Sequence, residues 1–190
     1  MDRIVLASAS PRRKQLLEWA EILFEVIPSD VDELISETLP VTEIPVFLAS
    51  QKAAVVRQKI SSGRIILAAD TIVVLDQQML GKPLDRSDAV RMLLLLSGKV
   101  HEVITGVSIT SAKKEILFAE TTRVRFHTLS RQEIEHYVDR YQPYDKAGAY
   151  AIQEWIGVTG IHSIEGDFYN VMGLPVSRVI QELKFFKAKP

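Results

Sequence analysis

The stretch from Ile65 to Leu75 constrains the fold most, because it is the most hydrophobic run in the sequence. Apolar residues at consecutive positions would cover both faces of a strand, which is typical of a strand at the centre of a sheet. Asp70 and Thr71 interrupt this run at its middle. A buried carboxylate is costly unless it is hydrogen-bonded, bound to a metal or placed at a cleft. The stretch therefore predicts a central strand with a catalytic or metal-binding Asp70, and a purely structural aspartate is the alternative.

The composition favours one α/β domain and excludes several kinds of site. With 190 residues, 47% of them hydrophobic, the chain can bury a sizeable core without cross-links. The absence of cysteine excludes disulfides, Cys-ligated zinc and thiol nucleophiles. A net charge of −1 does not favour a nucleic-acid polymer as partner, and no apolar run is long enough to span a membrane. A small anion held by a local basic cluster remains compatible with these properties.

A second informative stretch follows the short apolar strand Ile4–Leu6. Ser10 is a suitable N-cap for a helix whose first position is Pro11. Arg12 and Arg13 then place two positive charges at the positive end of the helix dipole, which is unfavourable without an anion. Helix N–H groups and two guanidinium groups together are typical of a phosphate site. The alternative is that both arginines point into water.

Lys52 is unusual because it lies within an apolar helix face. The pattern predicts a helix over Ile44–Ile60, in which Leu48, Lys52 and Val56 share one side. A lone ammonium group there is costly unless it has a partner. We expect Lys52 either to reach the solvent at the rim or to meet a negative charge or a ligand.

Four shorter segments supply further candidates. Residues 29–33 contain three acids, which form either a solvated loop or a site for a hard cation. Gly81-Lys82-Pro83 is typical of a loop that fixes the position of a lysine. In Thr105-Gly106 the glycine has no side chain, so a ligand or another backbone could approach there. Gln153 offers both a donor and an acceptor, which suits either a nucleobase edge or an ordinary strand end.

The remaining pattern alternates strands and helices, as in an α/β fold. We expect a turn at Asp76-Gln77-Gln78, a helix capped by Ser87, a capping box from Ser130 to Glu133, and a loop over Gly166–Pro175 before the last helix. Strands are predicted over Phe24–Ile27, Val103–Thr110 and Glu115–His127.

Seven segments taken together resemble the Maf family of nucleoside triphosphate pyrophosphatases, in the order and spacing of that family. They are Ser8-Ala9-Ser10-Pro11-Arg12-Arg13, Asp32-Glu33, Lys52, Ala69-Asp70-Thr71, Gly81-Lys82-Pro83, Thr105-Gly106-Val107 and Asp145-Lys146-Ala147-Gly148-Ala149-Tyr150. The resemblance implies one domain over residues 1–190, with the fold of the inosine triphosphate pyrophosphatases: an elongated mixed β-sheet flanked by helices, in two lobes with a central cleft.

The resemblance also implies a reaction. It is the hydrolysis of a nucleoside triphosphate to the monophosphate and pyrophosphate, in the cytoplasm, with Mg²⁺ or Mn²⁺ as the divalent cation. Ala149-Tyr150 followed by Ile152-Gln153 is similar to the subgroup that acts on dTTP and UTP, although Ala151 and Glu154 stand where glycine is common. No membrane partner is implied, and a homodimer is an open expectation because dimers are common for this fold.

On this basis each candidate residue receives an expected role. Asp70 would activate the attacking water and, with Glu33, bind the metal. Lys52 and Asp70 would compensate each other through the ligand and the metal. The residues expected to bind the substrate are Ser8, Arg12, Arg13, Lys52, Thr71, Lys82 and Gln153, with Arg12, Thr71 and Gln153 helping to select the nucleotide. Asp145 and Lys146 would support the site from behind these residues.

Two other classes of function stay open at this point. One is a pyrophosphatase for 7-methyl-GTP or inosine triphosphate, which would share the phosphate chemistry. The other is a nucleotide-binding regulator of septum formation, which would keep the basic residues without needing an acid aligned with a metal.

Overall fold

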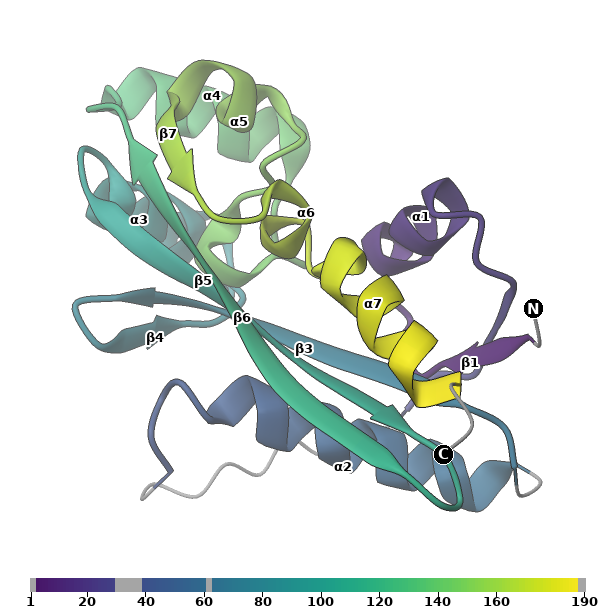
Figure 1. Ribbon diagram of the computed structural model, residues 1–190. Coiled ribbons are helices and arrows are strands. Elements are labelled where there is room, and N and C mark those ends of the chain that lie inside the picture. The colour runs from purple at the N-terminus through teal and green to yellow at the C-terminus, as the bar shows by residue number, and fades with distance from the viewer. Residues whose placement is uncertain (1–2, 30–38, 61–62, 188–190) are drawn as a thin grey trace. The chain divides into compact units, whose positions relative to one another are not determined.

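A computed structural model describes residues 3–29, 39–60 and 63–187 (Figure 1). The fold is α/β, as the sequence pattern predicts, and its sheet is mixed, as the resemblance implies. The strands are β1 (Ile4–Leu6), β2 (Phe24–Val26), β3 (Ile66–Leu75), β4 (Gln78–Leu80), β5 (Val100–Thr110), β6 (Glu115–Phe126) and β7 (Ile161–Glu165). The helices are α1 (Pro11–Trp19), α2 (Ile44–Lys59), α3 (Arg86–Leu96), α4 (Arg131–Tyr141), the 3₁₀ turn η1 (Ala147–Ala149), α5 (Trp155–Gly160), α6 (Phe168–Val171) and α7 (Val176–Lys187).

The strands of the described residues form one hydrogen-bonded sheet in the order β2-β1-β3-β5-β6-β7, with β4 also paired to β3. The pairs β1–β2 and β1–β3 are parallel, while β3–β4 and β6–β7 are antiparallel. Nine of the ten residues of β3 are buried, and Thr71 is partly exposed. The prediction of a central strand is therefore confirmed.

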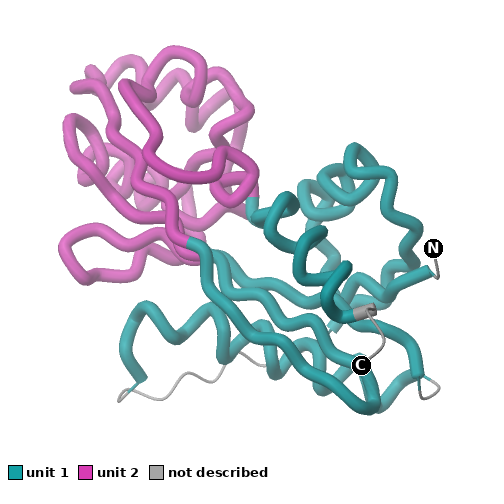
Figure 2. Tube along the Cα trace, in the orientation of Figure 1, with its two compact units in different colours: residues 1–71, 105–120, 173–190 teal, residues 72–104, 121–172 magenta. Residues whose placement is uncertain are grey.

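The chain divides into two compact units (Figure 2). Unit 1 comprises residues 1–71, 105–120 and 173–190, and unit 2 comprises residues 72–104 and 121–172. Within unit 1, α2 lies on one side of the strands, and α1 and α7 lie on the other (Figure 1). A cluster of buried residues packs α2 against β1 and β3: Val5, Ala7, Ala53, Val56, Ile66 and Ala68.

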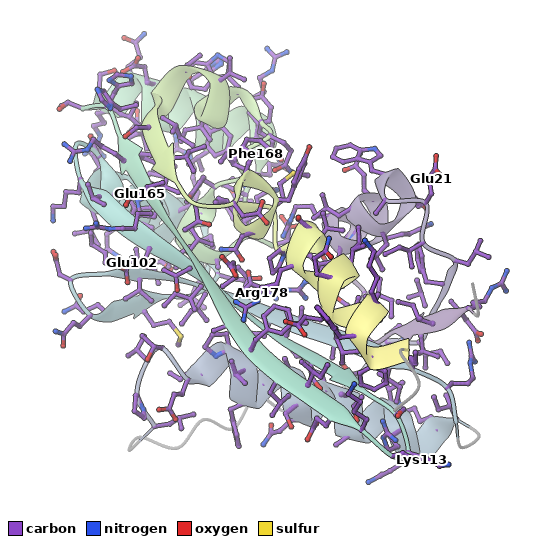
Figure 3. All side chains as sticks on the ribbon, viewed as in Figure 1. Glu21, Glu102, Lys113, Glu165, Phe168 and Arg178 are labelled. Atoms are coloured by element: carbon purple, nitrogen blue, oxygen red, sulfur yellow. The ribbon has the colours of Figure 1, made fainter. Side chains whose placement is uncertain are left out.

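Helix α7 is attached to β6 within unit 1 through Arg178, which is labelled in Figure 3. Its Nη1 donates to the Ala119 carbonyl at 2.9 Å and to Glu120 Oε2 at 2.8 Å. The guanidinium also lies 4.2 Å from the centre of the Phe118 ring. An arginine is suited to this position because one planar group serves a carbonyl, a carboxylate and an aromatic face together.

Local predictions agree with the structure where one short motif decides the outcome. Ser10 caps α1 with Pro11 in its first turn, and Ser130 and Glu133 form the capping box of α4.

The prediction for Ser87 is wrong, because the N-cap of α3 is Asp85. Its Oδ1 accepts the Asp88 N–H at 2.8 Å and the Ser87 hydroxyl at 2.6 Å. A carboxylate is the stronger acceptor, so the helix begins earlier than the serine suggests.

The predicted loop over Gly166–Pro175 is wrong in part. It contains the short helix α6, which begins where the Asp167 carboxylate accepts the Tyr169 N–H at 2.8 Å. Neither α5 nor β7 is expected from the sequence, because each is short and depends on its contacts with neighbouring elements. No helix among the described residues is both long and apolar enough to cross a membrane.

Candidate functional site

Arg13 connects three segments of unit 1. Its Nε donates to the Gly173 carbonyl at 2.8 Å, its Nη1 to Ser8 Oγ at 3.1 Å, and its Nη2 to Thr71 Oγ1 at 3.0 Å. The Thr71 hydroxyl also shares a hydrogen bond of 3.0 Å with Thr105 Oγ1. These acceptors are neutral, and together they join α1 to β3, to β5 and to the segment that precedes α7. The guanidinium of Arg13 is therefore anchored on the protein.

The loop before α1 is arranged by its own small polar side chains. Ser8 is 8% exposed, and its Oγ accepts the Ser10 N–H at 3.3 Å in addition to the Arg13 contact. Ser10 Oγ in turn accepts the Arg13 N–H at 3.5 Å as the helix cap. Arg12 lies in the first turn of the same helix and is partly exposed. Two adjacent arginines thus occupy the helix start predicted as an anion site.

Lys52 and Asp70 form a direct ion pair inside unit 1. Lys52 Nζ lies 2.5 Å from Asp70 Oδ1, and the two side chains are only 14% and 13% exposed. This resolves the question about the charge within the apolar face of α2, since Lys52 meets a negative charge. The two groups compensate each other by contact, whereas the sequence suggested compensation through a ligand and a metal.

Asp70 and Thr71 use opposite faces of β3. Consecutive residues of a strand point to opposite sides of the sheet, and Asp70 contacts Lys52 of α2 while Thr71 contacts Arg13 of α1. The unit 1 candidates thus form two groups: Lys52 with Asp70 on one face, and Ser8, Arg13 and Thr71 on the other.

The same alternation explains Thr105-Gly106 in β5. Thr105 contacts Thr71, whereas a Cβ built on Gly106 would lie 2.1 Å from the Pro45 carbonyl carbon and the Val46 nitrogen. Gly106 therefore admits the backbone of α2, which decides between the two alternatives open in the sequence. The close approach fastens the start of the helix that carries Lys52.

The residues of unit 1 fit a divalent cation in part. Among the described residues, no group of three or more His, Cys, Asp and Glu side chains could hold a metal ion. Asp32 and Glu33 lie outside the described residues. Mg²⁺ commonly binds through one or two carboxylates while it keeps waters and contacts substrate phosphates. The carboxylate of Asp70 suits that manner of binding.

Lys82 and Gln153, the remaining candidates, belong to unit 2. Both are exposed: Lys82 follows β4, and Gln153 precedes α5. The Gly81 carbonyl accepts the Gly148 N–H at 3.0 Å, which ties the lysine loop to η1 within this unit. Gly148 has a φ of 68° and packs against Val73, so a side chain there would be strained and crowded.

Lys146 is the buried cation of unit 2. Its Nζ lies 2.8 Å from Asp145 Oδ1 and 3.4 Å from Glu154 Oε1. Glu154 also accepts a short hydrogen bond from the Tyr137 hydroxyl. The sequence marks Lys146 and Glu154, but no pattern points to Tyr137, because its hydroxyl becomes relevant only through its partner on another element.

A family model and two named relatives each match nearly the whole chain. A family model described as "Maf-like protein" matches residues 3–186. A protein of Bacteroides fragilis (strain YCH46) named "dTTP/UTP pyrophosphatase" is 49% identical over 96% of this chain and 95% of its own length. One of Bacillus cereus (strain G9842) with the same name is 48% identical over 98% and 96%.

Among solved structures, a nucleoside-triphosphatase (dITP/XTP pyrophosphatase) of Mycobacterium abscessus matches with a TM-score of 0.40 and 14% identity, over 67% of this chain and 76% of that one. The family model covers almost the whole sequence, and relatives at nearly half identity do so as well. This chain belongs to the Maf family.

Proposed function

We propose that this chain hydrolyses dTTP and UTP to the nucleoside monophosphate and pyrophosphate. The observation that carries the proposal is the 49% identity, over 96% of the chain, to a protein named "dTTP/UTP pyrophosphatase". The paired Lys52 and Asp70 support it, because phosphoryl transfer needs a base and a nearby positive charge. Since nucleoside triphosphates are substrates of the cell interior, the proposal includes a cytoplasmic location.

Asp70 acts as the base in this proposal. Its carboxylate takes a proton from a water molecule, whose oxygen attacks the α-phosphorus. The bond from that phosphorus to the oxygen bridging to the β-phosphate breaks, and pyrophosphate leaves with the bond electrons. Lys52 holds the Asp70 carboxylate by their contact of 2.5 Å and places positive charge beside the phosphates.

A divalent cation, Mg²⁺ or Mn²⁺, is part of the proposal, with Asp70 and Glu33 as its protein ligands. When bound it would neutralise phosphate charge and polarise the phosphoryl oxygens.

The remaining residues bind and select the substrate. Arg12, Lys82 and Ser8, in the loop before α1, bind phosphate oxygens. Gln153 and Thr71 assist Arg12 in the choice of nucleotide. Arg13 contributes by holding Ser8 and Thr71, because its guanidinium donates to both side chains. A lysine could not replace it, since one ammonium group lacks the planar arrangement of donors.

The test is pyrophosphate release from purified protein with a panel of triphosphates: dTTP, UTP, dATP, inosine triphosphate and 7-methyl-GTP. The expected result is the highest kcat/KM for dTTP and UTP. Preference for 7-methyl-GTP or for inosine triphosphate would replace this function by that of the corresponding pyrophosphatase. Nucleotide binding without any pyrophosphate release would indicate a regulatory binder.

A further inference from the structure

Three polar side chains form a largely buried network inside unit 2. The Tyr137 hydroxyl, on α4, donates to Glu154 Oε2, and Glu154 Oε1 lies 3.4 Å from Lys146 Nζ. Tyr137 is fully buried, and the side chains of Lys146 and Glu154 are 10% and 22% exposed. Burial, and then the hydrogen bond to Glu154, raises the pKa of the Tyr137 hydroxyl, so this group stays protonated as a donor.

The network is fixed to the backbone of the segment that carries Gln153. The Ala151 N–H donates to the Tyr137 hydroxyl oxygen at 3.2 Å. The Glu154 N–H donates to the Ala151 carbonyl at 3.1 Å and closes a turn around Ile152 and Gln153. Tyr137 therefore holds both ends of this turn, one through the Ala151 amide and the other through the Glu154 side chain.

The turn is also pressed against the start of α5. The Gly157 N–H donates to the Glu154 carbonyl at 2.9 Å. A Cβ built on Gly157 would lie 1.7 Å from the Ile152 carbonyl oxygen, so only glycine allows this approach. Ile152 is buried and Gln153 is exposed, which leaves the amide side chain presented outward on a rigid backbone.

Glu154 stands at the N-cap of α5, yet its side chain makes no capping hydrogen bond. An acidic residue at a helix start is normally stabilised by the free N–H groups there. Here the carboxylate instead turns to Tyr137 and Lys146, where partial burial of the charge is compensated by those two partners. This orientation joins α4, the start of η1 and the start of α5, which a local cap would leave unconnected.

We propose that Tyr137, Glu154 and Lys146 are positioning residues for nucleobase selection, acting through the backbone on either side of Gln153. The inference rests on the proposed function, in which Gln153 reads the pyrimidine base. An amide can distinguish base edges only if its donor and acceptor are held at fixed places. The network supplies that restraint from behind, without touching the substrate.

The first test is the substitution Tyr137→Phe, which removes one oxygen and keeps the ring. The readout is the selectivity ratio, kcat/KM for dTTP divided by kcat/KM for dATP. We expect this ratio to fall about tenfold, the effect of losing a hydrogen bond to a charged group, while kcat for dTTP at saturation changes less than about twofold. An unchanged ratio in folded Tyr137→Phe would overturn the inference.

The matched control is Tyr141→Phe, on the same helix. The Tyr141 ring stacks on that of Tyr137 with centroids 5.0 Å apart, but its hydroxyl is not part of the network. The control should keep the wild-type selectivity ratio.

A second test is made at Glu154. Glu154→Ala should lower the selectivity ratio as Tyr137→Phe does, and Glu154→Gln, which keeps an oxygen for Tyr137, should lower it less.

A double-mutant cycle decides whether Tyr137 acts through Gln153. If it does, Tyr137→Phe should have almost no effect on the ratio once Gln153→Ala is present. Full additivity of the two substitutions would overturn the inference. A wild-type protein with no preference for dTTP over dATP would instead overturn the proposed function, so the two failures are distinguishable.

Discussion

Lys52 Nζ and Asp70 Oδ1 lie 2.5 Å apart, with both side chains largely withdrawn from solvent. Lys52 belongs to the apolar face of α2, and Asp70 interrupts the buried strand β3. Each charge would be costly alone at its position, and each makes the other tolerable. The pair gives the proposed base a fixed orientation, and the predictions about chemistry begin from it.

Asp70→Asn should remove nearly all turnover and retain the fold. The amide is nearly isosteric with the carboxylate but cannot accept a proton from water at neutral pH. We expect kcat to fall by about a thousandfold, within the range seen for removal of a general base. The measurement is pyrophosphate release from dTTP.

Urea unfolding of the same variant is the control, because Lys52 would then face a neutral amide. A loss of about 1–3 kcal/mol of unfolding free energy is expected for a partly buried charge without its counter-charge. A folded Asp70→Asn protein that keeps most of its activity would remove Asp70 from the role of base.

Arg13→Lys should impair both stability and catalysis. The ammonium group cannot reproduce the separate bonds to Ser8, Thr71 and Gly173. We expect the unfolding free energy to fall by about 1–3 kcal/mol and kcat/KM for dTTP to fall at least tenfold. Arg131→Lys, on an exposed residue paired with Glu135 along its own helix, is the surface control and should change neither quantity. Wild-type stability in Arg13→Lys would contradict the anchoring role.

Chelation by EDTA should stop pyrophosphate release, and excess Mg²⁺ or Mn²⁺ should restore it. The physical reason is that a triphosphate carries about four negative charges, which a cation must neutralise together with the basic side chains. Activity that is indifferent to EDTA would contradict the proposed metal requirement.

His101 should make the protein less stable in mild acid. The ring is 1% exposed and its Nε2 shares a hydrogen bond of 2.7 Å with the Tyr150 hydroxyl; burial lowers the pKa of His101 from 6.5 to about 4. Between these two pH values the unfolded chain binds a proton at His101 that the native state does not bind. The contribution of neutral His101 to the free energy of unfolding is therefore fully present above pH 6.5 and is lost as the pH falls towards 4.

The comparison of wild type with His101→Gln isolates this effect from other titrations. At pH 5 the histidine should reduce the unfolding free energy by about 2 kcal/mol relative to pH 7.5. The variant should lose correspondingly less over the same interval in urea unfolding. Equal losses in the two proteins would contradict the prediction.

The reliable sequence predictions concern elements that one local pattern decides. The apolar run of β3 on either side of Asp70 and Thr71, the Ser10 cap before Pro11 and the capping box of Ser130 all appear as expected. Where two acceptors competed for one helix start, the sequence favoured Ser87 and the structure chose Asp85. The outcome depended on relative acceptor strength and side-chain geometry, which spacing alone does not contain.

The candidate site divides in the same way. Sequence alone marked Lys52 and Asp70 as charges that need either a partner or access to solvent, because a charge in an apolar setting is costly wherever it lies. Only the tertiary structure decided that each is the other's partner. It also decided that Arg13 donates to the Gly173 carbonyl, 160 positions away, and that the Tyr137 hydroxyl donates to Glu154. A requirement for a partner is a property of one residue and its neighbours along the chain, whereas the choice of partner depends on which surfaces folding brings within hydrogen-bond distance.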